Sequence, residues 1–359
     1  MTEPYARRRE RAWERVAENA PDAEALLVTS LVNIRYLTGF SGSNAVLLLT
    51  GDQALLGTDG RYVVQATQEC PGLELLIDRE TLGAVAGSCA ARGAGPVAVE
   101  SEHLSLAQYR DLASTLPAIR ETTGLVEGCR IVKDAAELEL ISRACRISDE
   151  ALVDTLPTIR AGDSERAIAR RLEAAMFARG ADAISFDTIV AVGPNSAIPH
   201  HSPTDREIRP GDFLLIDFGA AVGGYHADET RTFVLGHAAE WQRELHALVL
   251  AAQESGRGAA LAGADLAHVD GAARDVIEAA GHGRDFGHGL GHGVGLQIHE
   301  APFMSARATG MLLCGSPVTI EPGVYLPERG GVRIEDTVSV TEGPCIPLTS
   351  TERGLLVLG

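Results

Sequence analysis

Short apolar runs alternate with helix-like stretches through the first third of the chain. Runs of strand length occupy residues 25–29, 44–50, 73–77 and 97–99, and helix-like patterns occupy residues 61–69 and 104–115. The arginine-rich segment 7–11 is interleaved with Glu and predicts one face of an N-terminal helix. Strands and helices that alternate in this way predict an α/β layer.

The pattern breaks around residues 126–133, and a long helical run follows from Asp134. Three further helices are predicted, one from the capping residues 163–165 to Gly180 and two at about 239–255 and 266–279. The first of these carries its apolar residues on one stripe, formed by Ile168, Leu172, Ala175 and Met176. Because 359 residues are long for one domain, we predict two, at 1–128 and 129–359.

Two acidic residues flank a predicted hairpin in the second domain. One strand-like apolar run ends in Asp217, and a second run, 229–235, follows Asp228. A turn through Gly223 and Gly224 would bring the two strands side by side and place both carboxylates at the same end of the strand pair. Asp is almost never buried without a partner or a cation, so both are candidate metal ligands.

The sharpest local signal is the glycine-rich segment 287–300, which contains His288, His292 and His299. The i, i+4 spacing of the first two histidines is compatible with a helix, but the interspersed glycines argue strongly against one. In an extended chain these two side chains lie on one face. The zinc-protease pattern H-E-x-x-H is absent, which disfavours that class of metalloprotease.

Two more acidic residues interrupt strand-like segments, Glu321 in 318–325 and Glu335 in 331–338. Arg333 precedes Glu335 by two positions, which places both on one face of a strand. Taken alone, that pair would be a surface ion pair of little energetic value, but the five acidic and histidine segments taken together argue against that interpretation.

The five candidate ligands together are Asp217, Asp228, His292, Glu321 and Glu335. Four carboxylates and one imidazole are too rich in oxygen for a structural zinc site, which favours Cys and His. Such a set suits Mn²⁺, Mg²⁺ or Co²⁺, and two cations about 3.5 to 4 Å apart can activate one water. The sequence therefore predicts a metal-dependent hydrolase.

The ligands lie in five short motifs: IDFG from Ile216, DETRTF from Asp228, HGLGHGVGLQIHE from His288, EPGVY from Glu321 and VRIED from Val332. These motifs resemble the pita-bread-fold metallopeptidases, peptidase family M24, which include methionine aminopeptidase, aminopeptidase P and prolidase. Segments 185–190 and 199–204 resemble the proline-specific branch of aminopeptidase P and prolidase. Segment 33–43 resembles the start of the N-terminal domain of prolidase, aminopeptidase P and creatinase, which most methionine aminopeptidases lack. The resemblance implies an α+β chain, with a creatinase-like α/β domain followed by a pita-bread domain that has an antiparallel sheet and paired helices.

The resemblance implies two divalent metal ions, foremost Mn²⁺, with Co²⁺ or Zn²⁺ as alternatives. Asp228 and Glu335 would bridge the two metals, and Asp217 would complete one of them. His292 and Glu321 would complete the other, and Glu321 would also act as general base.

Four further residues receive roles from the same resemblance. His200 and His299 would contact the substrate and stabilise the intermediate or the leaving group. His288 would close over the site, and Arg333 would orient a metal-binding carboxylate. For His201 two readings stay open, a substrate contact and an exposed loop residue.

The implied reaction is hydrolysis after the first residue of Xaa-Pro peptides, with the choice between dipeptides and longer peptides left open. The alternatives are a methionine aminopeptidase, a creatinase-like hydrolase that uses no metal, and a non-catalytic binding module of the same fold. The last two would tolerate the loss of metal ligands, and all five are present here.

Composition bounds the partners and the location. A net charge of −18 disfavours binding to nucleic acid or to anionic membranes. The six cysteines form no C-x-x-C pair, and neither a signal peptide nor a stretch of 18 apolar residues is found. We therefore expect a cytoplasmic protein, and the resemblance implies a homodimer.

Overall fold

The computed structural model describes residues 4–51 and 53–359. The chain divides into two compact units, Met1–Arg130 and Ile131–Gly359. Within the described residues no helix is both long and apolar enough to cross a membrane. The class is α+β, as predicted.

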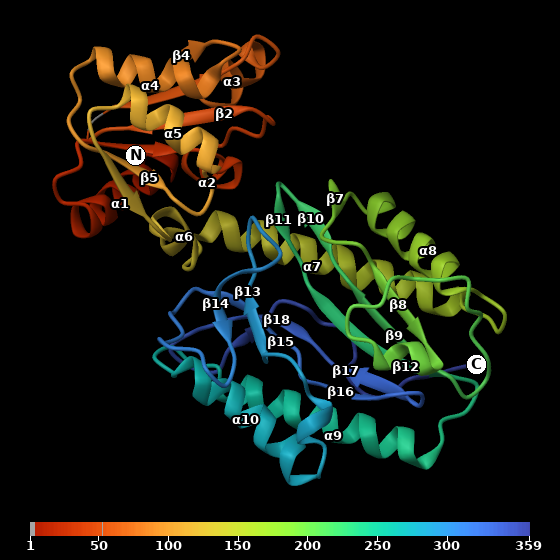
Figure 1. Cartoon of the computed structure of the whole chain (residues 1–359). Helices are drawn as coiled ribbons and strands as arrows, with labels where there is room; N and C mark the ends of the chain where they lie inside the picture. Colours follow the sequence, from red (N-terminus) through yellow and green to blue (C-terminus); the bar gives the residue numbers. More distant parts are fainter. Residues whose placement is uncertain (1–3, 52) are drawn as a thin grey trace. The chain divides into compact units, whose positions relative to one another are not determined.

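The first unit is built on a six-stranded mixed sheet (Figure 1), and its strand order is β4-β3-β2-β1-β5-β6. Its strands are β1 (Ala25–Val28), β2 (Ala45–Leu49), β3 (Ala54–Thr58), β4 (Glu74–Ile77), β5 (Val97–Glu100) and β6 (Ile119–Thr122). Its helices are α1 (Pro4–Asn19), α2 (Leu31–Thr38), α3 (Val63–Glu69), α4 (Thr81–Ala91), α5 (Leu106–Thr115) and α6 (Leu125–Arg130). The central β1 pairs antiparallel with β2 and parallel with β5, and α4 and α5 bury apolar side chains against this sheet. The predicted α/β layer is confirmed, although α2, α4, α6, β3 and β6 were not predicted.

The helices of the second unit form two pairs. The first pair is α7 (Ala135–Thr155) with α8 (Glu165–Ala178), and the second is α9 (Glu240–Ala259) with α10 (Leu266–Ala279). The Asp134 side chain caps α7 at the predicted start, in a reciprocal capping box with Glu137. Ser164 caps α8, whose predicted apolar stripe is buried except at Ala175, which is half-buried.

Two sheets of the second unit, antiparallel except where β20 pairs parallel with β12, carry the segments singled out in the sequence. The four-stranded sheet has the order β20-β12-β9-β8, and the five-stranded sheet has the order β14-β13-β15-β18-β19. The first comprises β8 (Ile189–Val192), β9 (Phe213–Phe218), β12 (Glu229–Leu235) and β20 (Val357–Leu358). The second comprises β13 (Gly291–Gly293), β14 (Glu300–Met304), β15 (Pro317–Ile320), β18 (Asp336–Ser339) and β19 (Ile346–Pro347).

Smaller strands and turns complete the unit. They are β7 (Ala183–Ile184), β10 (Ala220–Val222), β11 (Tyr225–His226), β16 (Gly323–Leu326) and β17 (Gly330–Arg333), with 3₁₀ turns at Leu156–Thr158, Gly193–Ala197 and Gly283–Asp285. The predicted hairpin is confirmed, because β9 pairs with β12 and the chain turns through Gly223 and Gly224. The amide of Glu335 donates to the Thr230 carbonyl at 3.1 Å, which joins the two larger sheets.

Candidate metal centre

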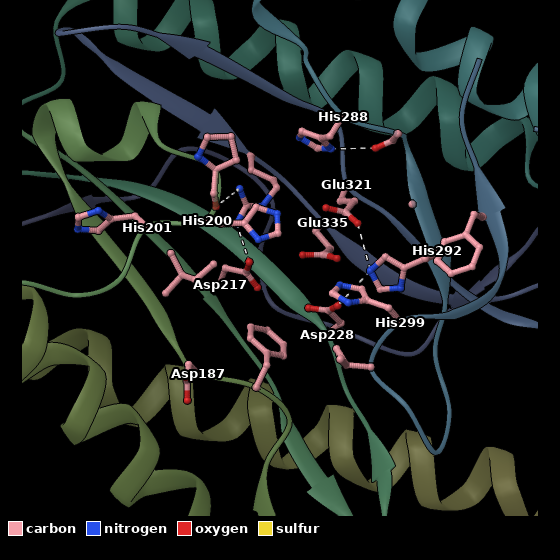
Figure 2. Close-up of a pocket in the computed structure, with 18 of the residues that line it drawn as sticks. Asp187, His200, His201, Asp217, Asp228, His288, His292, His299, Glu321 and Glu335 are labelled. Carbon is pink, nitrogen blue, oxygen red and sulfur yellow. Dashed lines mark hydrogen bonds and ion pairs between the residues drawn. The ribbon is translucent and has the colours of Figure 1, made fainter. Parts of the chain in front are cut away.

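A cavity of about 560 Å³ in the second unit collects all the candidate site residues (Figure 2). Its polar lining contains Asp217, Asp228, His292, Glu321, Glu335, His200, His201, His288, His299 and Arg333. Its apolar lining includes Phe186, Ile189, Ile298, Phe303 and Met304. A cavity of this volume is in the range that accommodates a small ligand.

Strand ends place the four carboxylates. Asp217 lies near the end of β9, directly opposite Thr230 of β12, and Asp228 immediately precedes β12. Glu321 immediately follows β15, and Glu335 lies in the short break between β17 and β18. Because the two sheets meet here, side chains from distant parts of the sequence face one another (Figure 2).

The glycine-rich segment is extended at residues 291–293, as predicted, and it places the candidate ligand His292. His292 lies on β13, between β14 and β15. A side chain at Gly291 would put its Cβ 2.0 Å from the Thr319 carbonyl oxygen, so only glycine allows this approach of the two strands. The amide of His292 donates to Thr319 Oγ1 at 3.0 Å, and the Glu321 amide donates to a carbonyl of the same segment.

The ligand atoms converge as a metal centre requires. His292 Nε2 lies 3.3 Å from Glu321 Oε1 and 3.6 Å from Asp228 Oδ2. Ligand atoms of Asp228, His292 and Glu335 all lie within 4.8 Å of one another. Asp217 Oδ1 is buried and has no hydrogen-bond partner among the described residues. An orphaned carboxylate oxygen beside clustered O and N donors fits a divalent cation.

The electrostatics of the cavity favour the same cation. Burial raises the pKa of Asp228 well above its usual range, and the negative charges of Glu335 and Asp217 raise it further. Burial and the neighbouring carboxylates also raise the pKa of Glu335 well above its ordinary value. Burial opposes ionisation of Glu321, but the hydrogen bond and charge of His292 outweigh it and lower the Glu321 pKa to about 2. A divalent cation would compensate the charges of the buried carboxylates.

These shifts predict how pH affects the protein without metal. The folded state holds protons on Asp228 and Glu335 where the unfolded chain has released them, so we expect the free energy of unfolding to fall as pH rises above about 4. The pKa of Glu321 is lowered, so this residue makes the free energy of unfolding rise with pH, but only at pH values below its ordinary pKa. Thermal unfolding of chelator-treated protein at pH 5 and pH 8 measures the effect.

Added Mn²⁺ should remove that loss of stability at pH 8. At 100 times the dissociation constant, one bound ion adds about 2.7 kcal/mol to the free energy of unfolding. The double variant Asp228→Asn, Glu335→Gln is the control, in which both the pH dependence and the Mn²⁺ effect should shrink. A metal-free wild-type protein that is as stable at pH 8 as at pH 5 would contradict the prediction.

Arg333 is buried rather than paired at the surface, so the isolated reading of an Arg333 and Glu335 surface pair is wrong. Its side chain is 4% exposed, and Nη2 donates to Asp217 Oδ2 at 2.6 Å. Nε donates to Thr230 Oγ1 at 3.1 Å, and Nη1 donates to the Tyr325 hydroxyl at 2.9 Å. Arg333 thus orients Asp217 through a charge-assisted hydrogen bond.

The remaining histidines differ in their surroundings. His288 is half-buried, and its Nε2 is 2.9 Å from the Tyr325 hydroxyl. His200 and His299 are exposed at the cavity, and the His299 ring meets the His292 ring edge to face at 4.4 Å. Burial, followed by the charge of His292, lowers the pKa of His299.

His201 is not an exposed loop residue. It is 9% exposed, and its Nε2 lies 2.8 Å from Glu165 Oε2. The same Glu165 oxygen accepts hydrogen bonds from the amide and hydroxyl of Thr204. Although His201 lines the cavity, its imidazole is held by this buried network.

Three hydroxyl residues that the sequence analysis did not single out support the ligands. The Thr230 hydroxyl donates to Glu335 Oε2 at 2.6 Å, and the Thr319 hydroxyl donates to Glu321 Oε1 at 3.2 Å. Tyr325 connects His288 with Arg333. Thr230 and Tyr325 lie inside motifs already noted, and Thr319 lies in the strand-like segment 318–325, and these positions were the only signal available for them.

The chain is similar to known proteins over nearly its whole length. Residues 139–342 match metallopeptidase family M24, and residues 8–132 match the creatinase/prolidase N-terminal domain. An Xaa-Pro dipeptidase of Pyrococcus furiosus is 36% identical over 351 residues, which cover 94% of this chain and 96% of the relative. The structure of an Xaa-Pro dipeptidase from Bacillus anthracis has a TM-score of 0.95 at 35% identity and covers 99% of this chain and 100% of that one. The structure of an X-Pro aminopeptidase from Thermotoga maritima has a TM-score of 0.90 at 36% identity and covers 97% of this chain and 99% of that one. The chain therefore belongs to metallopeptidase family M24.

Proposed function

We propose that this protein is a metal-dependent exopeptidase that releases the first residue of peptides with proline in second position. The observation that carries the proposal is the convergence of four carboxylates and His292 in one cavity that four further histidines and Arg333 also line. The Xaa-Pro names of the similar proteins support the choice of substrate. Nothing observed favours a methionine aminopeptidase, a creatinase-like hydrolase or a binding module.

The proposed cofactor is a pair of divalent ions, foremost Mn²⁺, with Co²⁺ or Zn²⁺ as alternatives. Asp217, Asp228, His292, Glu321 and Glu335 would hold them, with Asp228 and Glu335 shared between the two. When bound, such ions polarise a carbonyl oxygen and lower the pKa of a water molecule.

The other side chains are proposed to position the peptide and move protons. Glu321, ionised at neutral pH, accepts the proton of the attacking water. The Xaa-Pro bond is a tertiary amide without an N–H, so the leaving nitrogen must gain a proton. In this proposal His200 and His299, which line the cavity, supply that proton, and His288 contributes from the wall beside Tyr325. Phe186, Ile298 and Phe303 offer apolar surface to the proline ring.

The test measures release of the first residue from Ala-Pro, Ala-Pro-Ala and Met-Ala-Ser by metal-free protein, with and without Mn²⁺. We expect Mn²⁺-dependent cleavage of one or both proline peptides and no cleavage of Met-Ala-Ser. Cleavage of the dipeptide alone identifies a dipeptidase, and cleavage of the tripeptide identifies an aminopeptidase. Activity on Met-Ala-Ser alone, or on none of the three, would overturn the proposal.

The homodimer and the cytoplasmic location stay predictions. Sedimentation of the purified protein tests the first, and cell fractionation tests the second.

A further inference from the structure

We propose that Lys133 and Glu300 form a positioning pair that anchors the loop of residues 294–299 and thereby places His299 in the cavity. The loop, called the histidine loop below, runs from the end of β13 to the start of β14. The role of His299 in the reaction rests on the proposed function, whereas the anchoring of the loop does not.

Lys133 is the only lysine of the chain, and all other members of its 31 Lys and Arg residues are Arg. The Lys133 side chain is 1% exposed, and that of Glu300, with which it forms an ion pair, is 6% exposed. Removing two charges from water is costly, so a buried pair contributes little to net stability and is a candidate for fixing one arrangement of the chain. The Lys133 amide donates to the Gly315 carbonyl at 3.0 Å, which ties the backbone of the lysine to the same unit.

The pair lies directly against the backbone of the histidine loop. A Cβ at Gly295 would lie 2.2 Å from Glu300 Oε1 and 2.8 Å from Lys133 Cε, so the loop is glycine where the pair packs against it. Glu300 follows His299 directly and is opposite Gly293 of β13. The pair therefore contacts the loop and also holds the residue at its end.

The first half of the histidine loop is held by the buried side chains of Val294 and Leu296, and the Val294 amide donates to the Pro317 carbonyl at 3.1 Å. Gly295 donates to the Gln297 carbonyl at 3.1 Å, and its own carbonyl accepts from the His226 amide at 3.0 Å. Gln297 and His299 are exposed, and Ile298 is half-buried. Because Glu300 is the first buried side chain after these residues, its ion pair limits how far the His299 backbone can move. Lysine suits this buried position because its ammonium group is compact, whereas the planar guanidinium group of arginine needs more space.

The test uses the full chain loaded with Mn²⁺ and three variants. Lys133→Met removes the charge and keeps the length. The double variant Lys133→Met, Glu300→Gln removes both charges of the pair and so protects the measurement if the single variant fails to fold. Arg171→Met is the control, because it removes the ion pair between Arg171 of α8 and Asp163, and neither residue lines the cavity.

The first readout is amide hydrogen exchange, which needs no substrate. We expect faster exchange in the histidine loop of both Lys133 variants, unchanged exchange in β9 and β12, and an unchanged content of bound Mn²⁺. Arg171→Met should leave loop exchange as in the wild type. Unchanged loop exchange in the folded double variant would overturn the proposal, whether or not the wild-type protein cleaves any peptide.

The second readout is turnover of the preferred proline peptide. We expect kcat to fall by about 10- to 100-fold in the Lys133 variants, because removing a residue that supports a functional side chain has an effect of this size. The change in KM should be smaller. In a His299→Ala background the same Lys133 substitution should cause no further loss. An equal loss of kcat in both backgrounds would mean a general structural effect and would overturn the positioning role. If the wild type cleaves no peptide, the proposed function is wrong, and hydrogen exchange alone then tests whether Lys133 and Glu300 anchor the histidine loop.

Discussion

Replacing Glu321 with Gln is expected to lower kcat by at least about 10³-fold. Removal of a general base costs about 10²- to 10⁴-fold, and this substitution also takes one negatively charged oxygen from the metal centre. Gln has nearly the shape of Glu, and its remaining carbonyl can still accept from the Thr319 hydroxyl, which is 3.2 Å away. The fold should therefore survive, and the loss should reflect chemistry.

The measurement is kcat on the preferred proline peptide, combined with metal analysis of the purified variant. Glu342→Gln is the matched control, because Glu342 is exposed and outside the cavity. It should leave kcat and metal content unchanged. A Glu321→Gln variant with near-normal kcat would refute the role of Glu321 as base and ligand.

Replacing Arg333 with Met is expected to have the largest effect on stability and to weaken metal binding. The guanidinium contacts Asp217, Thr230 and Tyr325, so its removal leaves a buried carboxylate without its cation. Breaking a buried ion pair by removing one partner costs about 3–5 kcal/mol. Burial already raises the pKa of Asp217 and the charge of Arg333 opposes this, so the variant should raise that pKa further and make Asp217 a poorer ligand.

Loss of a residue that orients a metal ligand lowers metal affinity by about 10- to 100-fold. Chemical denaturation without metal gives the stability change, and titration with Mn²⁺ gives the affinity. Arg333→Lys is the informative companion, because it keeps the charge and loses the planar fork that bonds three partners at once. It should recover part of the stability and less of the affinity. Unchanged Mn²⁺ affinity in Arg333→Met would show that Asp217 needs no support.

Local signals in the sequence were sufficient to predict the elements whose ends are marked by a capping or turn residue. Asp134 predicts the start of α7 because its side chain can cap the first turn, and Gly223 with Gly224 predicts the hairpin. Helix α4 was missed because Gly83 and Gly87 lower its intrinsic helicity. Its stability comes from packing on the sheet, which no local pattern reports.

The residues of the site also divide into those that local sequence patterns indicate and those that only the tertiary structure shows. Charged residues that interrupt apolar strands were visible from sequence, and the structure brings these side chains to one cavity. Their hydrogen-bond partners were not visible, because a hydroxyl such as that of Tyr325 has no distinctive pattern. Arg333 bonds Asp217, which lies 116 positions away, and the spacing of residues along the chain does not indicate that partner.

The buried lysine also makes the chain unusual as a protease substrate. A lysine-specific endoprotease has one bond to cut, between Lys133 and Asp134, three residues beyond the boundary of the two compact units. The side chain that such an enzyme must bind is 1% exposed, and Asp134 is engaged as the cap of α7. Cleavage therefore requires this segment to open, and it would release two fragments that correspond closely to the two units. The rate of a single cut would thus report how often the start of the second unit unfolds.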